Sequence, residues 1–122
     1  MISKIEITGV KMDVDKKLHD YVTKKIGHLD RYMPSKARQS AHAEVFLKER
    51  KIKQKKECTA EVTIRLPKGN VTAKETTINI FAAVDIVEAK LKNQIKRYKG
   101  QHSILRGHTR RLIEKFRSQS TA

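Results

Sequence analysis

The stretch from Phe81 to His102 constrains the fold most, because its pattern predicts one long amphipathic helix. Wound at about 100° per residue, it gathers a mainly apolar set of side chains on one stripe, which Val84 and Ile95 widen. Neither glycine nor proline interrupts the stretch before Gly100. A helix of this kind must cover its stripe with a sheet or another helix. The stripe consists of Ala83, Val87, Leu91, Gln94 and Tyr98.

Basic side chains follow both flanks of this stripe. Lys92, Lys96 and Lys99 fall on one flank at spacings i, i+4 and i+7, while Lys90 and Arg97 fall on the other. Because a helix holds these cations in fixed places, the pattern favours a partner that is anionic, long and regular.

A second amphipathic helix is predicted over about residues 14–33. Asp13 or Asp15 can cap its start, and Pro34 ends it. Its apolar face consists of Val14, Leu18, Val22, Ile26, Leu29 and Met33. A basic row on the far side consists of Lys17, Lys24, His28 and Arg31, with Tyr21 and Lys25 between that row and the apolar face.

Alternation of apolar and polar residues predicts four strands. The last strand changes its apolar phase, which predicts a bulge near residues 74–77. Residues 48–56 hold six cations and one acid, so we interpret them as a flexible hairpin loop. The strands are expected over about residues 2–8, 38–48, 58–66 and 71–80.

The order β-α-β-β-β-α predicts a single α+β domain. We expect a four-stranded, mainly antiparallel sheet with both helices packed on one face. The first strand reaches the sheet through a helix crossover, so its pairing is expected to be parallel. The two helices would then lie side by side, with their basic rows at the surface that they share.

The overall charge points to a polyanionic partner. The chain of 122 residues has 28 Lys and Arg against 13 Asp and Glu, which gives +15 and a pI of about 10.2. Nucleic acid is the favoured partner. A membrane surface is disfavoured because aromatic residues are 5% of the chain and Trp is absent. A single cysteine and an N-terminus without a secretory apolar region predict a cytoplasmic protein.

Enzymatic chemistry is disfavoured. Cys58 lies on the apolar face of its strand, the five histidines show no metal-binding spacing, and the glycines form no phosphate-binding loop. Asp85 and Glu88 lie one turn apart near a helix start, where they suit the helix dipole better than acid–base catalysis. We therefore expect no cofactor, no metal and no small-molecule substrate. Base stacking on the sheet is also disfavoured, because only Phe46 stands out on the expected open face.

Four segments of the chain resemble the ribosome hibernation-promoting factor family, which includes protein Y, also called ribosome-associated inhibitor A. The likeness covers about residues 1–102. Asn79 and Phe81 replace an Asp and a Tyr that are common in the family, and Val10 stands where Arg is frequent. The four segments are Ile5–Gly9, Tyr21–Tyr32, Asn79–Asp85 and the basic run KLKNQIKRYK at 90–99.

The resemblance implies a fold like that of double-stranded-RNA-binding domains and a site in the mRNA and tRNA channel of the small ribosomal subunit. Binding there would stop translation and store ribosomes under stress or in stationary phase. Residues 1–102 would form the ribosome-binding domain, and 103–122 a basic tail that is partly helical or disordered. The charge rows and the resemblance together predict rRNA contacts by Lys17, Lys24, Lys25, His28, Arg31, Lys90, Lys92, Lys96, Arg97 and Lys99.

Several alternatives stay open at this point. The same cations would serve a general double-stranded-RNA-binding protein or RNA chaperone, or a structural protein that docks an acidic partner. Long members of the family have a second domain, so this chain is either a short form or the N-terminal part of a long one. We expect a monomer off the ribosome. The pattern does not distinguish a factor that pairs ribosomes from one that holds single ribosomes inactive.

Overall fold

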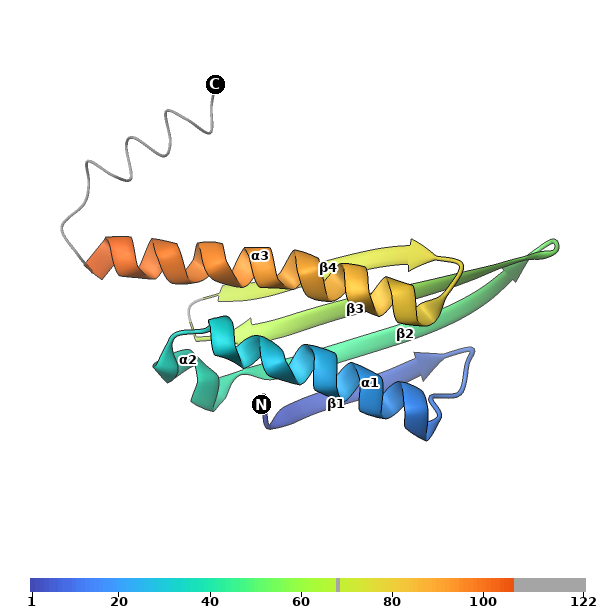
Figure 1. Cartoon of the computed structure of the whole chain (residues 1–122), viewed down its shortest axis with the longest axis horizontal. Helices are drawn as coiled ribbons and strands as arrows, with labels where there is room; N and C mark the ends of the chain where they lie inside the picture. Colours follow the sequence, from blue (N-terminus) through green and yellow to red (C-terminus); the bar gives the residue numbers. More distant parts are fainter. Residues whose placement is uncertain (68, 107–122) are drawn as a thin grey trace, which may run out of the picture.

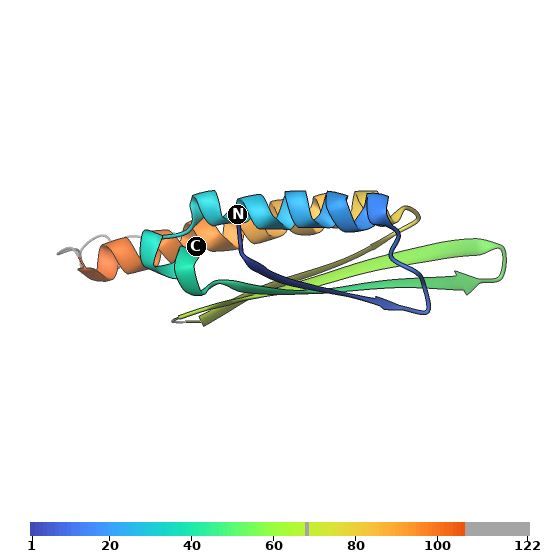
Figure 2. The ribbon, with the colours of Figure 1, turned by 90° about the horizontal axis from the view of Figure 1, so that it is seen from below.

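A computed structural model of the chain describes residues 1–67 and 69–106, with side chains described through Tyr98. It consists of one twisted sheet with its helices on a single face (Figures 1 and 2). The elements are β1 (Lys4–Val10), α1 (Lys16–Gly27), the 3₁₀ helix η1 (His28–Tyr32), α2 (Ser35–Ser40), β2 (His42–Ile52), β3 (Lys55–Leu66), β4 (Gly69–Thr77) and α3 (Ile80–Arg106).

The sheet has the strand order β1-β2-β3-β4. β1 is parallel to β2, whereas β2–β3 and β3–β4 are antiparallel, so the predicted mixed sheet and its parallel first strand are confirmed. A parallel pair needs a crossover connection, and α1, η1 and α2 form it. The likeness to double-stranded-RNA-binding domains stays a prediction.

The core lies between the sheet and the helices. Val22 and Ile26 of α1 are fully buried there, as are Val87 and Leu91 of α3. Inward residues such as Val62 cover them from the sheet side. Burying each such side chain contributes about 1.5–3 kcal/mol, so the core orients both helices firmly. The predicted apolar faces are therefore the faces that the fold buries.

The helix predicted over residues 14–33 is shorter than expected. Asp15 caps it by accepting a hydrogen bond from the Leu18 amide (2.8 Å), but the α-helix ends at Gly27 and continues as η1, so the prediction of one helix over 14–33 is wrong. At Gly27 the N-terminal segment comes close: the Ile2 amide donates to the Gly27 carbonyl at 2.9 Å. A Cβ there would lie 3.1 Å from the methyl carbon of Met1. The six-residue helix α2 was not predicted.

The prediction of a flexible loop at 48–56 is also wrong. β2 and β3 stay paired out to Ile52 and Lys55, so only Lys53 and Gln54 form the turn. A β-ladder satisfies backbone donors and acceptors whatever the side chains are. A strongly charged sequence can therefore remain an ordered hairpin when water reaches both of its faces.

β4 has no bulge. β3 and β4 keep one continuous register, so the bulge predicted near 74–77 is wrong. The apolar alternation breaks because Glu75 takes the helix-facing position that follows Ala73. Its carboxylate pairs with the Lys90 ammonium of α3 (Nζ–Oε2 2.6 Å), which makes an acidic residue tolerable at that position.

Helix α3 also covers the edge of the sheet at β4. The Gln94 side chain bonds both backbone groups of Thr72: Nε2 donates to the carbonyl (2.6 Å) and Oε1 accepts from the amide (3.1 Å). Lys90 donates to the Lys74 carbonyl at 3.3 Å. Edge strands expose unpaired backbone groups, and these contacts occupy several of them. Gln94, the one polar amide in the predicted stripe, thus has a structural role.

The helix predicted over residues 81–102 is present and continues through Arg106, so the proposed boundary at 102/103 falls inside α3. Most of the predicted tail, residues 107–122, lies outside the described residues, and the domain division stays a prediction. None of the helices within the described part of the chain is long and apolar enough to cross a membrane.

Candidate nucleic-acid interface

Helices α1 and α3 lie side by side and run in the same direction (Figure 1). At their N-terminal ends the Tyr21 ring meets the Phe81 ring edge-on with centroids 5.0 Å apart, and the Lys17 ammonium lies 5.9 Å from the Phe81 centroid. At the other end Tyr32 of η1 reaches Lys96 of α3. The prediction that the two helices lie side by side is confirmed.

Tyr32 is the centre of a cluster of three cations. The charged groups of Lys92, Lys96 and Arg31 lie 5.0, 5.5 and 5.8 Å from its ring centroid. Attraction between a cation and the face of an aromatic ring contributes about 0.5–1 kcal/mol at exposed sites. Arg31 is held further by a hydrogen bond from Nε to the His28 carbonyl at 3.2 Å. The ring therefore keeps the cations of η1 and α3 close together despite their mutual repulsion.

A shallow hollow of about 320 Å³ lies beside this cluster. Four of its lining side chains are basic, and they project from α1 and η1. A phosphate group would fit this combination of open shape and positive charge, because guanidinium and ammonium groups donate charge-assisted hydrogen bonds to phosphate oxygens. The hollow is lined by Tyr21, Lys24, Lys25, His28, Arg31 and Glu88.

Two acids of α3 hold the helices together and reduce the local positive charge. The Lys25 ammonium lies 3.5 Å from Asp85 and 3.8 Å from Glu88. The Tyr21 hydroxyl donates a short hydrogen bond to Asp85, and this bond, with burial and the nearby negative charge, raises the pKa of Tyr21 to about 12. Asp85 and Glu88 thus have electrostatic partners that explain their presence near the start of α3.

The predicted site residues do not all meet in one place. Lys90 lies at the β4 edge, where its hydrogen bond and charge lower the pKa of Glu75. Arg97 is exposed seven residues further along the same flank of α3, and Lys17 lies near the N-terminal ends of the helices. Lys99 lies in α3, but its side chain is not among those described. The residues that the structure brings together, called the helix surface below, are Lys24, Lys25, His28, Arg31, Tyr32, Lys92 and Lys96.

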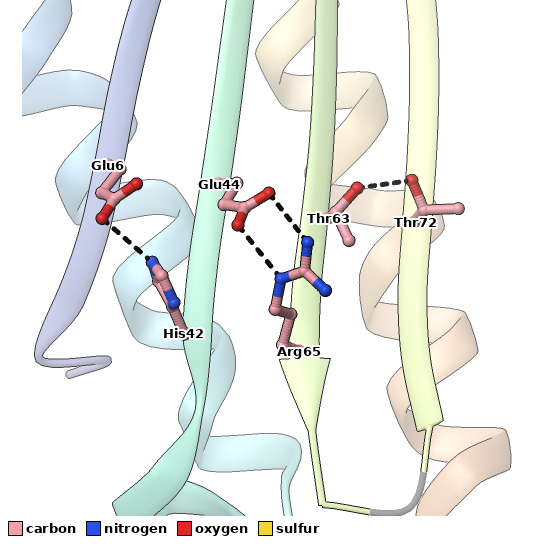
Figure 3. Close-up of polar contacts among 6 residues, drawn as sticks. All are labelled: Glu6, His42, Glu44, Thr63, Arg65 and Thr72. Carbon is pink, nitrogen blue, oxygen red and sulfur yellow. Dashed lines mark hydrogen bonds and ion pairs between the residues drawn. The ribbon is translucent and has the colours of Figure 1, made fainter.

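The open face of the sheet is different in character, because its charged groups pair with one another across strands (Figure 3). Arg65 donates to Glu44 at 3.0 Å, and His42 lies 3.5 Å from Glu6. These pairs leave the centre of the open face mixed in sign. Phe46 is 42% exposed on this side, as predicted. The helix side therefore offers the more concentrated positive surface.

The part of the chain that the structure describes offers little for catalysis. Within it, no three side chains among His, Cys, Asp and Glu are grouped to hold a metal ion. Cys58 is buried, and burial raises the pKa of its thiol, which disfavours the reactive thiolate. Tyr32 is the important residue that charge patterns missed, although it stands at the end of the Tyr21–Tyr32 segment on which the family resemblance partly rests.

Comparison with known proteins places these features in context. Residues 5–103 match the family described as "Sigma 54 modulation protein / S30EA ribosomal protein". The chain is 30% identical over 105 residues to a ribosome hibernation promoting factor of Pseudomonas putida, covering 85% of this chain and 95% of that protein. It is 35% identical over 98 residues to a ribosome hibernation promotion factor of Lactococcus lactis, covering 79% of this chain but 49% of that protein.

A solved structure shares the same architecture. The N-terminal domain of protein Y from Thermus thermophilus superimposes with a TM-score of 0.66 at 29% identity, covering 78% of this chain and 98% of that domain. A ribosomal subunit interface protein from Coxiella burnetii superimposes with a TM-score of 0.65 at 22% identity, which supports the fold.

Proposed function

This chain belongs to the Sigma 54 modulation protein / S30EA ribosomal protein family, and from that premise we propose that it is a ribosome-associated translation inhibitor, or hibernation factor. It binds rRNA in the mRNA and tRNA channel of the small subunit, in the cytoplasm. Occupying that channel excludes mRNA and tRNA and stores ribosomes inactive under stress or in stationary phase. The protein acts without enzymatic chemistry and is a monomer off the ribosome.

The observation that best supports this proposal is the helix surface. Lys24 and Arg31 on one side, and Lys92 and Lys96 on the other, project from elements that the core holds rigidly. Each phosphate neutralised by such a cation releases counterions, which adds affinity that does not depend on sequence. Cations in fixed positions suit a folded RNA, whose phosphates are also fixed. Lys17, Lys90, Arg97 and Lys99 extend the proposed contact beyond this centre.

A general double-stranded-RNA-binding protein is the second candidate, because phosphate contacts alone do not select one RNA. The two proposals differ in what they bind best. A hibernation factor prefers the assembled small subunit, where phosphates from separate rRNA segments converge. A general binder has similar affinity for any duplex.

Co-sedimentation distinguishes the two candidates. The purified protein is mixed with small subunits, with whole ribosomes or with a generic RNA duplex, and each mixture is spun over a series of salt concentrations. We expect saturable binding near one per ribosome that persists at salt which removes the protein from the duplex. Equal, equally salt-sensitive binding would favour the general RNA binder, and absence of binding to both would refute both proposals. The same gradients reveal whether paired ribosomes form.

A further inference from the structure

The β2–β3 hairpin extends beyond the rest of the sheet as a two-stranded ribbon (Figure 1). Pairing of β1 with β2 ends at Lys48, and pairing of β4 with β3 ends at Cys58. Residues 49–57 therefore have no third strand beside them: residues 50–52 pair with 55–57, and Glu49 pairs with Cys58. β2 runs four residues past Lys48 and β3 begins three residues before Cys58, so at about 3.3 Å per residue the tip lies roughly 10–13 Å past its neighbours. Both α1 and α3 begin at this end of the molecule (Figures 1 and 2).

The charge on this ribbon is high and poorly compensated. Residues 48–57 hold six cations and two acids. Lys51 and Lys56 stand directly opposite each other across the ladder, an arrangement that is destabilising for like charges. Glu49 lies 3.4 Å from the Lys56 ammonium. Among the described side chains, no carboxylate forms an ion pair with Lys51, so this cross-strand repulsion would be relieved by an external anion.

The tip also contains a backbone conformation that its sequence does not favour. Lys53 has φ of 58°, in the left-handed region where glycine is preferred in two-residue hairpin turns. A lysine here costs stability relative to glycine, yet it places an ammonium group at the outermost point of the chain's sheet. Its side chain is exposed, as are those of Lys55 and Gln54. The position combines a projecting charge with backbone strain, which clusters at functional sites.

We propose that this hairpin tip is a second RNA-binding element, which contacts the sugar–phosphate backbone of rRNA at a place separate from the helix surface. The inference rests on the proposed function, because it takes rRNA as the partner. The ribbon has no aromatic side chain between residues 48 and 57, so it contacts phosphates and does not stack on bases. The hairpin tip and the helix surface together would bind two separate segments of a folded RNA.

Three variants with equal loss of charge test this proposal. The hairpin variant combines Lys51→Gln, Lys53→Gly and Lys55→Gln. The helix-surface variant combines Lys24→Gln, Lys92→Gln and Lys96→Gln. The control combines Lys4→Gln, Lys36→Gln and Lys74→Gln, exposed residues that belong to neither element. Affinity for small subunits is measured over a salt series, together with chemical footprinting of the rRNA and a thermal melt of each protein.

We expect the hairpin variant to bind more weakly than the control. Its plot of log K against log salt should be less steep, by about 0.7–0.9 for each phosphate that the protein no longer neutralises. The rRNA should lose protection at nucleotides that the helix-surface variant still protects. The single change Lys53→Gly should reduce the slope by about 0.7–0.9 while leaving the melting temperature equal or higher. This single variant reports on binding even if the triple variant folds poorly.

The outcomes separate the two proposals. If the wild type binds and the hairpin variant matches the control in affinity and slope, the hairpin proposal is overturned and the proposed function stands. If affinity falls but the footprint is unchanged, the hairpin contacts a protein surface, and RNA binding by the tip is refuted. If the wild type fails to bind ribosomes at all, the proposed function itself fails.

Discussion

Tyr21 of α1 donates a hydrogen bond from its hydroxyl to the carboxylate of Asp85 in α3. Lys25, one turn further along α1, pairs with the same carboxylate at 3.5 Å. This polar junction lies beside the hollow in the helix surface. It fixes the relative position of the two helices that hold most of the predicted contact residues.

The first prediction concerns this junction. Tyr21→Phe removes the hydrogen bond but keeps the ring contact with Phe81, so it should lower the free energy of unfolding by about 0.5–1 kcal/mol. Because the folded-state pKa of Tyr21 is about 12, above its ordinary value of 10.0, its contribution is complete below pH 10 and is lost as the pH rises toward 12. Urea unfolding from pH 8 to 12 should show the two proteins converging. A constant difference across that range would refute the hydrogen bond.

The second prediction concerns the protected sheet edge. Gln94→Ala leaves both Thr72 backbone groups without their side-chain partner, so unfolding should become easier by about 1–2 kcal/mol and the β4 edge should become available for pairing. Urea unfolding and light scattering on concentration measure the two effects. Asn93→Ala, at the neighbouring exposed position of α3, is the matched control. Equal stability of the two variants would show that the edge contacts contribute nothing.

Much of this fold is predictable from the sequence, because apolar periodicity reports which face an element buries. Val87 and Leu91 repeat at helical spacing, and Val45 and Leu47 alternate as a strand requires. The errors occur where polar residues have structural partners. Glu75 interrupts the alternation of β4 and suggests a bulge, yet Lys90, distant in sequence, satisfies it.

The hairpin was missed for a different reason. Its composition is that of a solvated loop. Sequence patterns based on apolar burial do not detect a strand pair that buries no apolar face. Gly27 stands inside the helix predicted over 14–33, but the reason for it, the close approach of Met1 and Ile2, appears only in three dimensions. The candidate site was also only partly predictable. Residue spacing predicted the basic rows, whereas the position of Tyr32 among them depends on tertiary packing.

The third prediction separates Lys90 from the cations of the helix surface. Lys90→Gln removes the partner of Glu75, so the depressed pKa of that carboxyl should rise toward its ordinary value in an NMR titration. The stability gained from the pair is present above the ordinary pKa of Glu and is lost as the pH falls through the folded-state pKa, so variant and wild type should converge in acid. Ribosome binding should fall less than for Lys92→Gln. A larger fall would place Lys90 at the centre of the contact.

The fourth prediction tests Tyr32 as the organiser of the cation cluster. Tyr32→Leu keeps an apolar side chain at this position but removes the ring that faces Arg31, Lys92 and Lys96. Because the three cations then repel each other without compensation, they should spread apart and affinity for small subunits should fall by about threefold to tenfold. Tyr32→Phe retains the ring and should bind as the wild type does. Equal loss in both variants would assign the effect to the hydroxyl group.

The fifth prediction addresses the helix surface directly. Reversing Lys92, Lys96 and Lys99 to Glu should abolish ribosome binding, because repulsion of phosphate replaces attraction at neighbouring positions. Lys92 and Lys96 lie off the buried stripe formed by Leu91 and Ile95, so circular dichroism and the melting temperature should stay near those of the wild type. Reversal of Lys4, Lys36 and Lys74, which changes the net charge by the same amount, should weaken binding far less. If the first variant still binds as the control does, α3 lies away from the rRNA, and the contact must be sought on another face of the protein.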